Sequence, residues 1–253
     1  MDFSRQIPYT SHVMKRFVRS LREIPKYGWI LSVVCFGLDM AAYYFGTLFN
    51  RLLGTNAWQF APKIPCIDDR IPIIGIFMVP YLLSYALWIL GFALVSLTGR
   101  KRFMNFIAGL SLSYFIGFLF FVFMPTYMDR AMEGFIEYTK RTDFNGFLFR
   151  LVYANDGGDF GFNLFPSFHC MISVFCYLGI RKQETVSRGI RIFTLVSTVT
   201  ICLSTVFVKQ HYIIDVVGGV LLAIVCHEAA QKHNLSSCLP RFIREPHQGP
   251  SSD

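Results

Sequence analysis

The sequence predicts an all-α integral membrane protein: a bundle of six transmembrane helices, with an N-terminal interfacial helix and short helices in the outer loop between spans 3 and 4. Apolar residues make up 53% of the 253 residues, and the mean hydropathy is +0.44. The apolar residues lie in stretches whose lengths are close to the roughly 20 residues that a helix needs to cross a bilayer. We place the spans at residues 28–49, 72–97, 103–124, 164–180, 190–208 and 211–230.

The segment before the first span is basic and amphipathic. Within residues 10–26, apolar residues fall on one helical face and basic residues largely on another: Val13, Phe17, Leu21 and Ile24 against Lys15, Arg16, Arg19 and Arg22. This pattern predicts a helix lying on the anionic cytoplasmic surface of the membrane, with an unstructured basic tail as the alternative. We expect three parts: a cytoplasmic basic segment (1–27), a six-helix membrane domain (28–232) and a partly disordered cytoplasmic tail (233–253).

The positive charge is distributed in a way that orients the spans. The net charge is +8, but the basic residues lie in loops and termini between apolar spans rather than in one polar patch, so nucleic acid is not an expected partner. If the N-terminus is cytoplasmic, 16 of the 24 Lys and Arg residues fall in or beside cytoplasmic segments. The positive-inside rule therefore favours two cytoplasmic termini and places the long loops 50–71 and 125–163 outside.

Polar residues that can carry chemistry recur at the predicted outer ends of the spans. "PSFH", Pro166 to His169, begins the fourth span, where Ser167 can offer a hydroxyl or a free N–H to a phosphate. His211 and Asp215 begin the sixth span at a spacing of four, which puts them on one helical face. Arg130 follows the third span. The topology thus predicts one cluster at one membrane face.

This cluster has the composition of a phosphate-handling site. One histidine can attack phosphorus and the other can protonate the leaving oxygen, while Arg130 and Lys209 hold the charge on the phosphate oxygens. Nothing in the pattern requires a metal ion or another cofactor, and the seven cysteines have no metal-binding spacing. The expected partners are a lipid phosphate substrate and membrane lipids.

Two of these motifs resemble those of a known family. "PSFH", followed by Ser204, His211 and Asp215, resembles the second and third signature motifs of the type 2 phosphatidic acid phosphatase superfamily, P-S-G-H and S-R-x5-H-x3-D. The contexts "YANDGGDFGFNLFPSFH" and "STVFVKQHYIIDVVGG" are most similar to the branch of the inositolphosphorylceramide and sphingomyelin synthases and many bacterial relatives. The resemblance covers roughly residues 70–230 and implies an enzyme of a bacterial plasma membrane with an extracytoplasmic active site.

The resemblance also implies a role for each residue. His211 is the nucleophile that forms a phosphohistidine, and Asp215 orients it. His169 protonates the leaving alcohol and later activates the acceptor. Arg130 corresponds to the arginine of the first motif, K-x6-R-P. Ser167 and Ser204 are further candidate phosphate ligands.

Four positions depart from the family motifs. Phe123 and Ala131 replace the lysine and the proline of the first motif, Phe168 replaces the glycine of the second, and Thr205 replaces the arginine of the third. Lys209 is a candidate substitute for a missing cation. Its ammonium group is a single point charge, whereas the guanidinium of an arginine is planar and can donate two parallel hydrogen bonds.

The sequence therefore predicts a metal-independent membrane lipid phosphatase or phosphotransferase that cleaves a lipid phosphate ester or phosphodiester at the extracytoplasmic face. The alternatives are a lipid or proton-coupled transporter that uses Asp39 and Asp215, and a catalytically silent lipid-binding relative. Asp39, near the middle of the first span, is expected to face the bundle interior. Gly218 and Gly219 are expected to let the sixth span pack closely on a neighbour.

Overall fold

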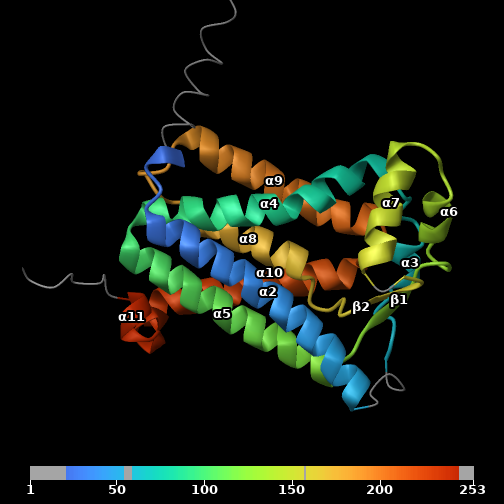
Figure 1. Ribbon diagram of the computed structural model, residues 1–253, viewed down its shortest axis with the longest axis horizontal. Coiled ribbons are helices and arrows are strands. Elements are labelled where there is room, and N and C mark those ends of the chain that lie inside the picture. The colour runs from blue at the N-terminus through green and yellow to red at the C-terminus, as the bar shows by residue number, and fades with distance from the viewer. Residues whose placement is uncertain (1–20, 54–58, 157, 245–253) are drawn as a thin grey trace, which may run out of the picture.

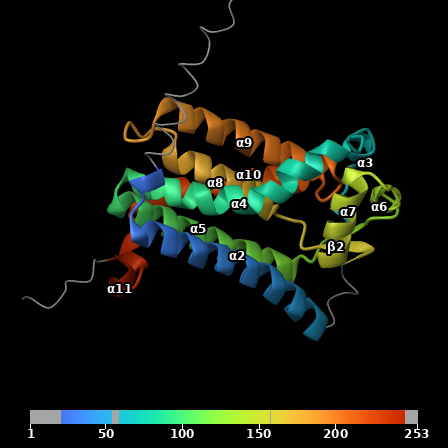
Figure 2. The ribbon, with the colours of Figure 1, turned by 45° about the horizontal axis from the view of Figure 1, so that its top comes forward.

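The computed structural model describes residues 21–53, 59–156 and 158–244, and it is a helical bundle (Figure 1). The interfacial helix predicted for 10–26 lies mostly outside the described residues. The six main helices are α2 (Lys26–Leu52), α4 (Met78–Val95), α5 (Arg100–Phe123), α8 (Phe168–Ile180), α9 (Arg188–Phe207) and α10 (Ile213–His233). Figure 2 shows them running side by side, with α2 and α5 on one side of the bundle and α9 on the other.

Five helices of the described residues are long and apolar enough to cross a membrane. They span Lys26–Leu52, Gly75–Thr98, Arg100–Phe123, Arg188–Phe207 and Ile213–His233, and so support an integral membrane protein. The helix at the predicted fourth span, α8, has 13 residues. At about 1.5 Å per residue it is shorter than a bilayer core of about 30 Å, so six full spans remain a prediction.

Helix α8 lies in the core of the bundle. Ten of its 13 residues are buried, including Met171, Ile172 and Phe175. By contrast, α2, α9 and α10 keep large apolar side chains exposed, among them Val33, Val196 and Val225. An exposed apolar surface of this kind fits a hydrocarbon environment, because apolar groups gain nothing from contact with water.

Side chains near the helix ends define where several helices begin. Ser167 and Ser187 accept from the backbone N–H groups three residues later, Cys170 and Ile190, and so begin α8 and α9. Asp143 accepts from Gly146 N at 2.9 Å and begins α7 (Phe144–Asn155). At the start of α10 the Asp215 carboxylate accepts from Tyr212 N at 2.8 Å. These contacts satisfy N–H groups that a helix leaves unpaired at its first turn.

One end of the bundle is covered by short elements, at the right in Figure 1. They are α3 (Pro65–Asp68), β1 (Tyr127–Asp129), α6 (Phe135–Thr139), α7 and β2 (Phe160–Phe162). Strands β1 and β2 pair antiparallel with Met128 opposite Gly161, and the sequence pattern did not indicate this ribbon. The ribbon ties the chain leaving α5 to the chain entering α8. At the opposite end η5 (Leu235–Cys238) and α11 (Arg241–Arg244) follow α10.

Candidate active site

The first turns of α8 and α10 lie against each other at the end of the bundle that the short elements cover. The Ser167 N–H donates to the Asp215 carbonyl at 3.0 Å, so the two motifs are joined through their backbones. Gly219, one turn further along α10, makes this approach possible, because a Cβ there would overlap the Ser167 carbonyl oxygen. A Cβ at Gly218 would likewise meet the Phe165 ring. The predicted role of both glycines in close packing is confirmed.

His211 lies in a tight turn between α9 and α10. The carbonyl of Thr205 accepts from both Gln210 N and His211 N, at 2.9 and 3.1 Å, and Lys209 adopts a left-handed backbone with φ of 52°. This turn directs the imidazole back toward α8. Its Nδ1 lies 3.5 Å from Asp215 Oδ2, a distance that is longer than a good hydrogen bond. A small movement would close the contact and leave Nε2 free to react.

His169 is enclosed by aromatic rings rather than by hydrogen-bond partners. Tyr81 stacks on it with ring centroids 4.4 Å apart, and Tyr85 and Trp88 approach it edge-on at 5.5 and 5.0 Å. Its ring centroid lies 6.0 Å from that of His211. The buried Nε2 of His169 has no hydrogen-bond partner among the described residues. The rings therefore hold the His169 imidazole in place, and its Nε2 is available to give or take a proton.

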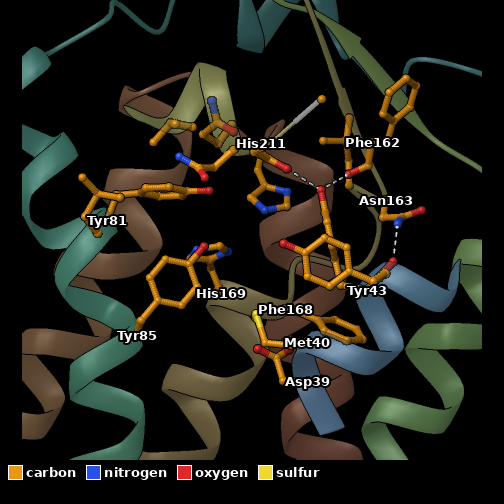
Figure 3. Close-up of a pocket in the computed structure, with 18 of the residues that line it drawn as sticks. Asp39, Met40, Tyr43, Tyr81, Tyr85, Phe162, Asn163, Phe168, His169 and His211 are labelled. Carbon is orange, nitrogen blue, oxygen red and sulfur yellow. Dashed lines mark hydrogen bonds between the residues drawn. The ribbon is translucent and has the colours of Figure 1, made fainter. Parts of the chain in front are cut away.

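Both histidines open onto one cavity of about 370 Å³. Figure 3 shows the two imidazoles near the middle of the view, between the Tyr81 and Tyr85 rings on one side and Tyr43 on the other, with Asp39 at the lower end. The helices α2, α4, α7, α8 and the β2 segment all contribute lining residues. Its size is within the range of small-ligand pockets.

Arg130 lies behind the cavity wall rather than in the cavity. It is fully buried at 0% exposure and is not among the lining residues. Its terminal amino groups donate to the Asp156 carbonyl, to Asp156 Oδ2 at 2.7 Å, to the Gly158 carbonyl at 2.8 Å and to Gln210 Oε1 at 3.0 Å. These bonds hold the loop and the neighbour of His211, while the buried Nε of Arg130 has no hydrogen-bond partner among the described residues. A phosphate contact by Arg130 stays a prediction.

Lys209 is also engaged elsewhere. Its Nζ donates to the Asp68 carbonyl at 2.8 Å and lies 3.5 Å from Glu133 Oε2. Asp68 in turn accepts from Ile213 N at 3.0 Å, so this contact anchors the start of α10. The role of Lys209 as a substitute for a missing phosphate-binding cation stays a prediction. Its charge neutralises a buried carboxylate.

Glu133 gathers further partners around the start of α10. It accepts from Tyr212 Oη at 3.2 Å and pairs with Lys63 at 2.7 Å. Burial, and then the Glu133 carboxylate, raise the pKa of Tyr212 above its ordinary value. Burial acts to lower the pKa of Lys63, but its contacts with Asp69 and Glu133 raise it overall. The network holds the His211 turn from the side away from the cavity.

The two predicted serine ligands are used in local structure. Ser167 is fully buried, its N–H donates to Asp215, and its Oγ accepts from Cys170 N at 3.4 Å. Ser204 is equally buried and donates to the Ile201 carbonyl at 2.7 Å. Neither residue lines the cavity. Among the residues that the structure describes, no group of three or more His, Cys, Asp or Glu side chains is placed to hold a metal ion.

A family model of the PAP2 superfamily matches residues 58–229, which is more than half of the chain. The chain belongs to the PAP2 superfamily. This is the type 2 phosphatidic acid phosphatase superfamily that the motifs resemble, and its members are phosphatases and phosphotransferases. Searches among curated proteins and among solved structures gave no match.

The structure adds residues to this PAP2-superfamily site that motif spacing did not single out. Tyr81 and Trp88 come from α4 and pack on His169, and Asp156 and Gln210 carry the contact of Arg130 to the cavity wall. The position of Gln210 directly before His211 in the sequence could have indicated that it belongs to the site. The sequence does not indicate that the aromatic residues of α4 belong to the site, because such residues are common in any apolar helix.

Proposed function

We propose that this protein is a membrane lipid phosphatase or phosphotransferase that forms a phosphohistidine on His211. Its membership of the PAP2 superfamily supports chemistry on phosphoric esters. The observation that carries the finer proposal is the pair of imidazoles in one cavity, with ring centroids 6.0 Å apart. A phosphorus atom placed between them would be within reach of both rings.

The proposed reaction has two steps. In the first, Nε2 of His211 attacks phosphorus, the bond from phosphorus to the lipid alcohol oxygen breaks, and Nε2 of His169 gives its proton to that oxygen. The Asp215 carboxylate, 3.5 Å from Nδ1, stabilises the positive charge that His211 gains. In the second, His169 takes a proton from water or from an alcohol, whose oxygen then attacks the phosphohistidine and releases His211.

The test is a comparison of His211→Ala with His233→Ala. Both histidines belong to the α10 region, but His233 is exposed at the far end of the helix. Purified variants are incubated in detergent with a panel of lipid monoesters and diesters, with and without alcohol acceptors, and with a chelator present. We expect His211→Ala to lose turnover and His233→Ala to keep it. A folded His211→Ala variant with normal activity would refute the mechanism.

The same assay addresses the other functions that the sequence allows. Movement of substrate across vesicle membranes without any phosphate release would favour a transporter. Lipid binding without vanadate-sensitive activity on any lipid phosphate would favour a silent relative. The intermediate is tested directly with a lipid that carries a labelled phosphate. We expect the label to become attached to His211 and to be lost at low pH, as a phosphohistidine is, but not at neutral or alkaline pH.

We further propose that the active site is extracytoplasmic and that both termini are cytoplasmic, with the catalytic residues inside the domain 28–232. Two exposed cysteines at opposite ends of the bundle allow a test: Cys66 lies in α3 near the site, and Cys238 lies in η5. In intact cells a membrane-impermeant maleimide should label Cys66 and spare Cys238. The reverse pattern would invert the orientation. Cys66→Ser and Cys238→Ser variants identify which cysteine reacts.

A further inference from the structure

A second pocket lies at the end of the bundle opposite the two catalytic histidines, where η5 and α11 follow α10, at the left in Figure 1. It has a volume of about 200 Å³ and is formed by the start of α5, the end of α8 with the turn that follows it, and the last turns of α10. None of its described lining residues also lines the cavity of the histidines. The two are therefore separate sites.

Basic side chains dominate this second pocket. Arg102, Arg181 and Lys182 line it, and Glu228 is the single carboxylate among its described lining residues. Glu228 pairs with Arg181 at 2.7 Å. Arg102 donates to the neutral side chain of Gln183, and Lys182 forms no hydrogen bond or ion pair within the described part of the chain. Two positive charges thus share one pocket without a counter-charge from those residues.

A buried histidine in the same pocket also lacks a partner. His227 lines the pocket and is 7% exposed, and its buried Nδ1 has no hydrogen-bond partner among the residues that the structure describes. The closest approach to a carboxylate is 3.5 Å, to Glu228 Oε1, which already accepts from Arg181. A buried polar nitrogen without a partner costs free energy. A ligand that accepts a hydrogen bond from this ring would therefore stabilise the pocket.

The charges and the size of the pocket fit a phosphate group. A guanidinium donates parallel hydrogen bonds to phosphate oxygens, and an ammonium group adds a compact positive charge. The volume of about 200 Å³ is below the range of pockets that enclose a drug-sized ligand. The pocket can thus enclose a small anionic group and leave the rest of a larger molecule outside.

An apolar face of α10 leads up to this pocket. Val217, Leu221 and Ile224 are exposed, and they precede Glu228 at successive spacings of four, three and four residues. Side chains at these spacings share one helical face, and α10 is long and apolar enough to cross a membrane. A lipid can place its phosphate in the pocket while its acyl chains lie along this face, whereas a soluble phosphate would use the pocket alone.

We propose that the second pocket binds the phosphate of an anionic phospholipid from the membrane leaflet on its side, which is the cytoplasmic leaflet in the orientation proposed above. Arg102 and Lys182 hold the negative charge, His227 Nδ1 donates to a phosphate oxygen, and the acyl chains lie along the apolar face of α10. Anionic lipids are abundant in the cytoplasmic leaflet, and basic pockets between spans on that side attract their head groups. The bound lipid ties α5, α8 and α10 together away from the chemistry.

The test compares Lys182→Glu with Lys101→Glu. Both lysines are exposed at the same end of the bundle and both substitutions change the net charge equally, but Lys101 does not line the pocket. The purified full chain in a neutral detergent is titrated with phosphatidylglycerol, with phosphatidylcholine of the same chains, or with inorganic phosphate. Bound lipid is counted by native mass spectrometry, and the unfolding temperature is measured.

We expect phosphatidylglycerol to bind the wild type and to raise its unfolding temperature, because a ligand that binds the folded state stabilises it. Lys182→Glu should weaken this binding about tenfold or more, since it turns an attractive charge into a repulsive one. Lys101→Glu should change it by about twofold or less, because an exposed charge outside the pocket is screened by salt.

A second pair of variants separates the charge of Arg102 from its packing. Arg102→Lys keeps the charge and should keep most of the binding, whereas Arg102→Gln should weaken it about fivefold or more. Unfolding without added lipid identifies a variant that fails to fold. Lys182 is exposed and makes no contact with a charged or hydrogen-bonding partner in the described part of the chain, so Lys182→Glu then decides.

The outcomes distinguish this site from its alternatives. Equal effects of Lys182→Glu and Lys101→Glu would indicate general surface attraction and overturn the proposal. Equally tight binding of phosphatidylcholine, or of inorganic phosphate, would reject an anionic lipid as the ligand. Phosphatidylglycerol binding that no pocket variant weakens would assign the lipid to another place, the histidine cavity included. Because binding is measured without turnover, each result is independent of the reaction proposed for His211.

Discussion

The backbone N–H of Ser167 donates to the carbonyl of Asp215 at 3.0 Å, and this contact joins the two halves of the candidate active site. The residues are 48 positions apart in the sequence. Because each belongs to the first turn of its helix, the bond sets the start of α8 against the start of α10. His169, in the first turn of α8, and His211, in the hydrogen-bonded turn just before α10, are thereby held at one cavity.

Asp215 has two functions that a single substitution can separate. Its carboxylate accepts from Tyr212 N at 2.8 Å and lies 3.5 Å from His211 Nδ1. Asp215→Asn keeps an acceptor for the helix start but loses the charge, so we expect a wild-type unfolding temperature and turnover reduced by roughly 10²–10⁴-fold, as for other His–Asp pairs. Asp215→Ala should lower both. Full activity in Asp215→Asn would exclude an electrostatic role.

Gly219 is required by the close approach of α10 to α8. A methyl group there would overlap the Ser167 carbonyl oxygen and crowd Met171 N at 3.2 Å, and both atoms are backbone that cannot rotate away. We expect Gly219→Ala to lower the unfolding temperature and to reduce turnover by displacing His169. Gly37→Ala is the control, since nothing lies within 4 Å of a Cβ at Gly37. Similar behaviour of the two variants would contradict this account.

Arg130 is expected to act by positioning rather than by binding phosphate. Arg130→Lys keeps the charge but cannot bond Asp156, Gly158 and Gln210 together, and the loss of buried charge-assisted hydrogen bonds should cost about 1.5–3 kcal/mol of unfolding free energy. Arg150→Lys is the control: Arg150 is exposed on α7 and donates only to the Thr139 and Arg141 carbonyls, so its replacement should cost less.

Asp156→Asn distinguishes the two roles of Arg130. If Arg130 holds the loop, Asp156→Asn should reduce turnover and stability along with Arg130→Lys. If Arg130 bound phosphate directly, releasing it from Asp156 would leave turnover unchanged or raise it. The kinetic constants and unfolding temperatures of both variants are the measurements.

The start of α7 should depend on pH through Asp143. The hydrogen bond from Arg141, and then that from Gly146 N, hold the pKa of Asp143 below its ordinary 3.8. Because the folded value is the lower one, this stabilisation is present above pH 3.8 and is lost as the pH falls through the folded value. Hydrogen exchange in α7, corrected for the intrinsic rate, should therefore speed up at acidic pH.

Asp143→Asn is the control for this pH effect. Asparagine still caps a helix but does not titrate, so exchange in α7 should lose its acid dependence while the protection near neutral pH largely remains. An unchanged acid dependence in this variant would assign the effect to other groups.

The sequence by itself determined the apolar helices, the order of the motifs and the pairing of His211 with Asp215. These features depend on local rules: an apolar run crosses a bilayer, and residues four apart share a helical face. The same local reasoning assigned Gly218 and Gly219 to close packing. It could not show that α8 is a short core helix, since composition alone does not distinguish a buried helix from a spanning one.

Only the tertiary structure decided what the charged and aromatic side chains contact. The sequence predicts Arg130 and Lys209 as phosphate ligands but not their protein partners. The fold places Asp156 and Gln210 beside Arg130, and Asp68 and Glu133 beside Lys209. It also leaves Asp39 in the cavity without a partner in the described residues. The physical reason is that a long side chain can satisfy its charge with any group within reach, and which groups are within reach is set by contacts between distant segments.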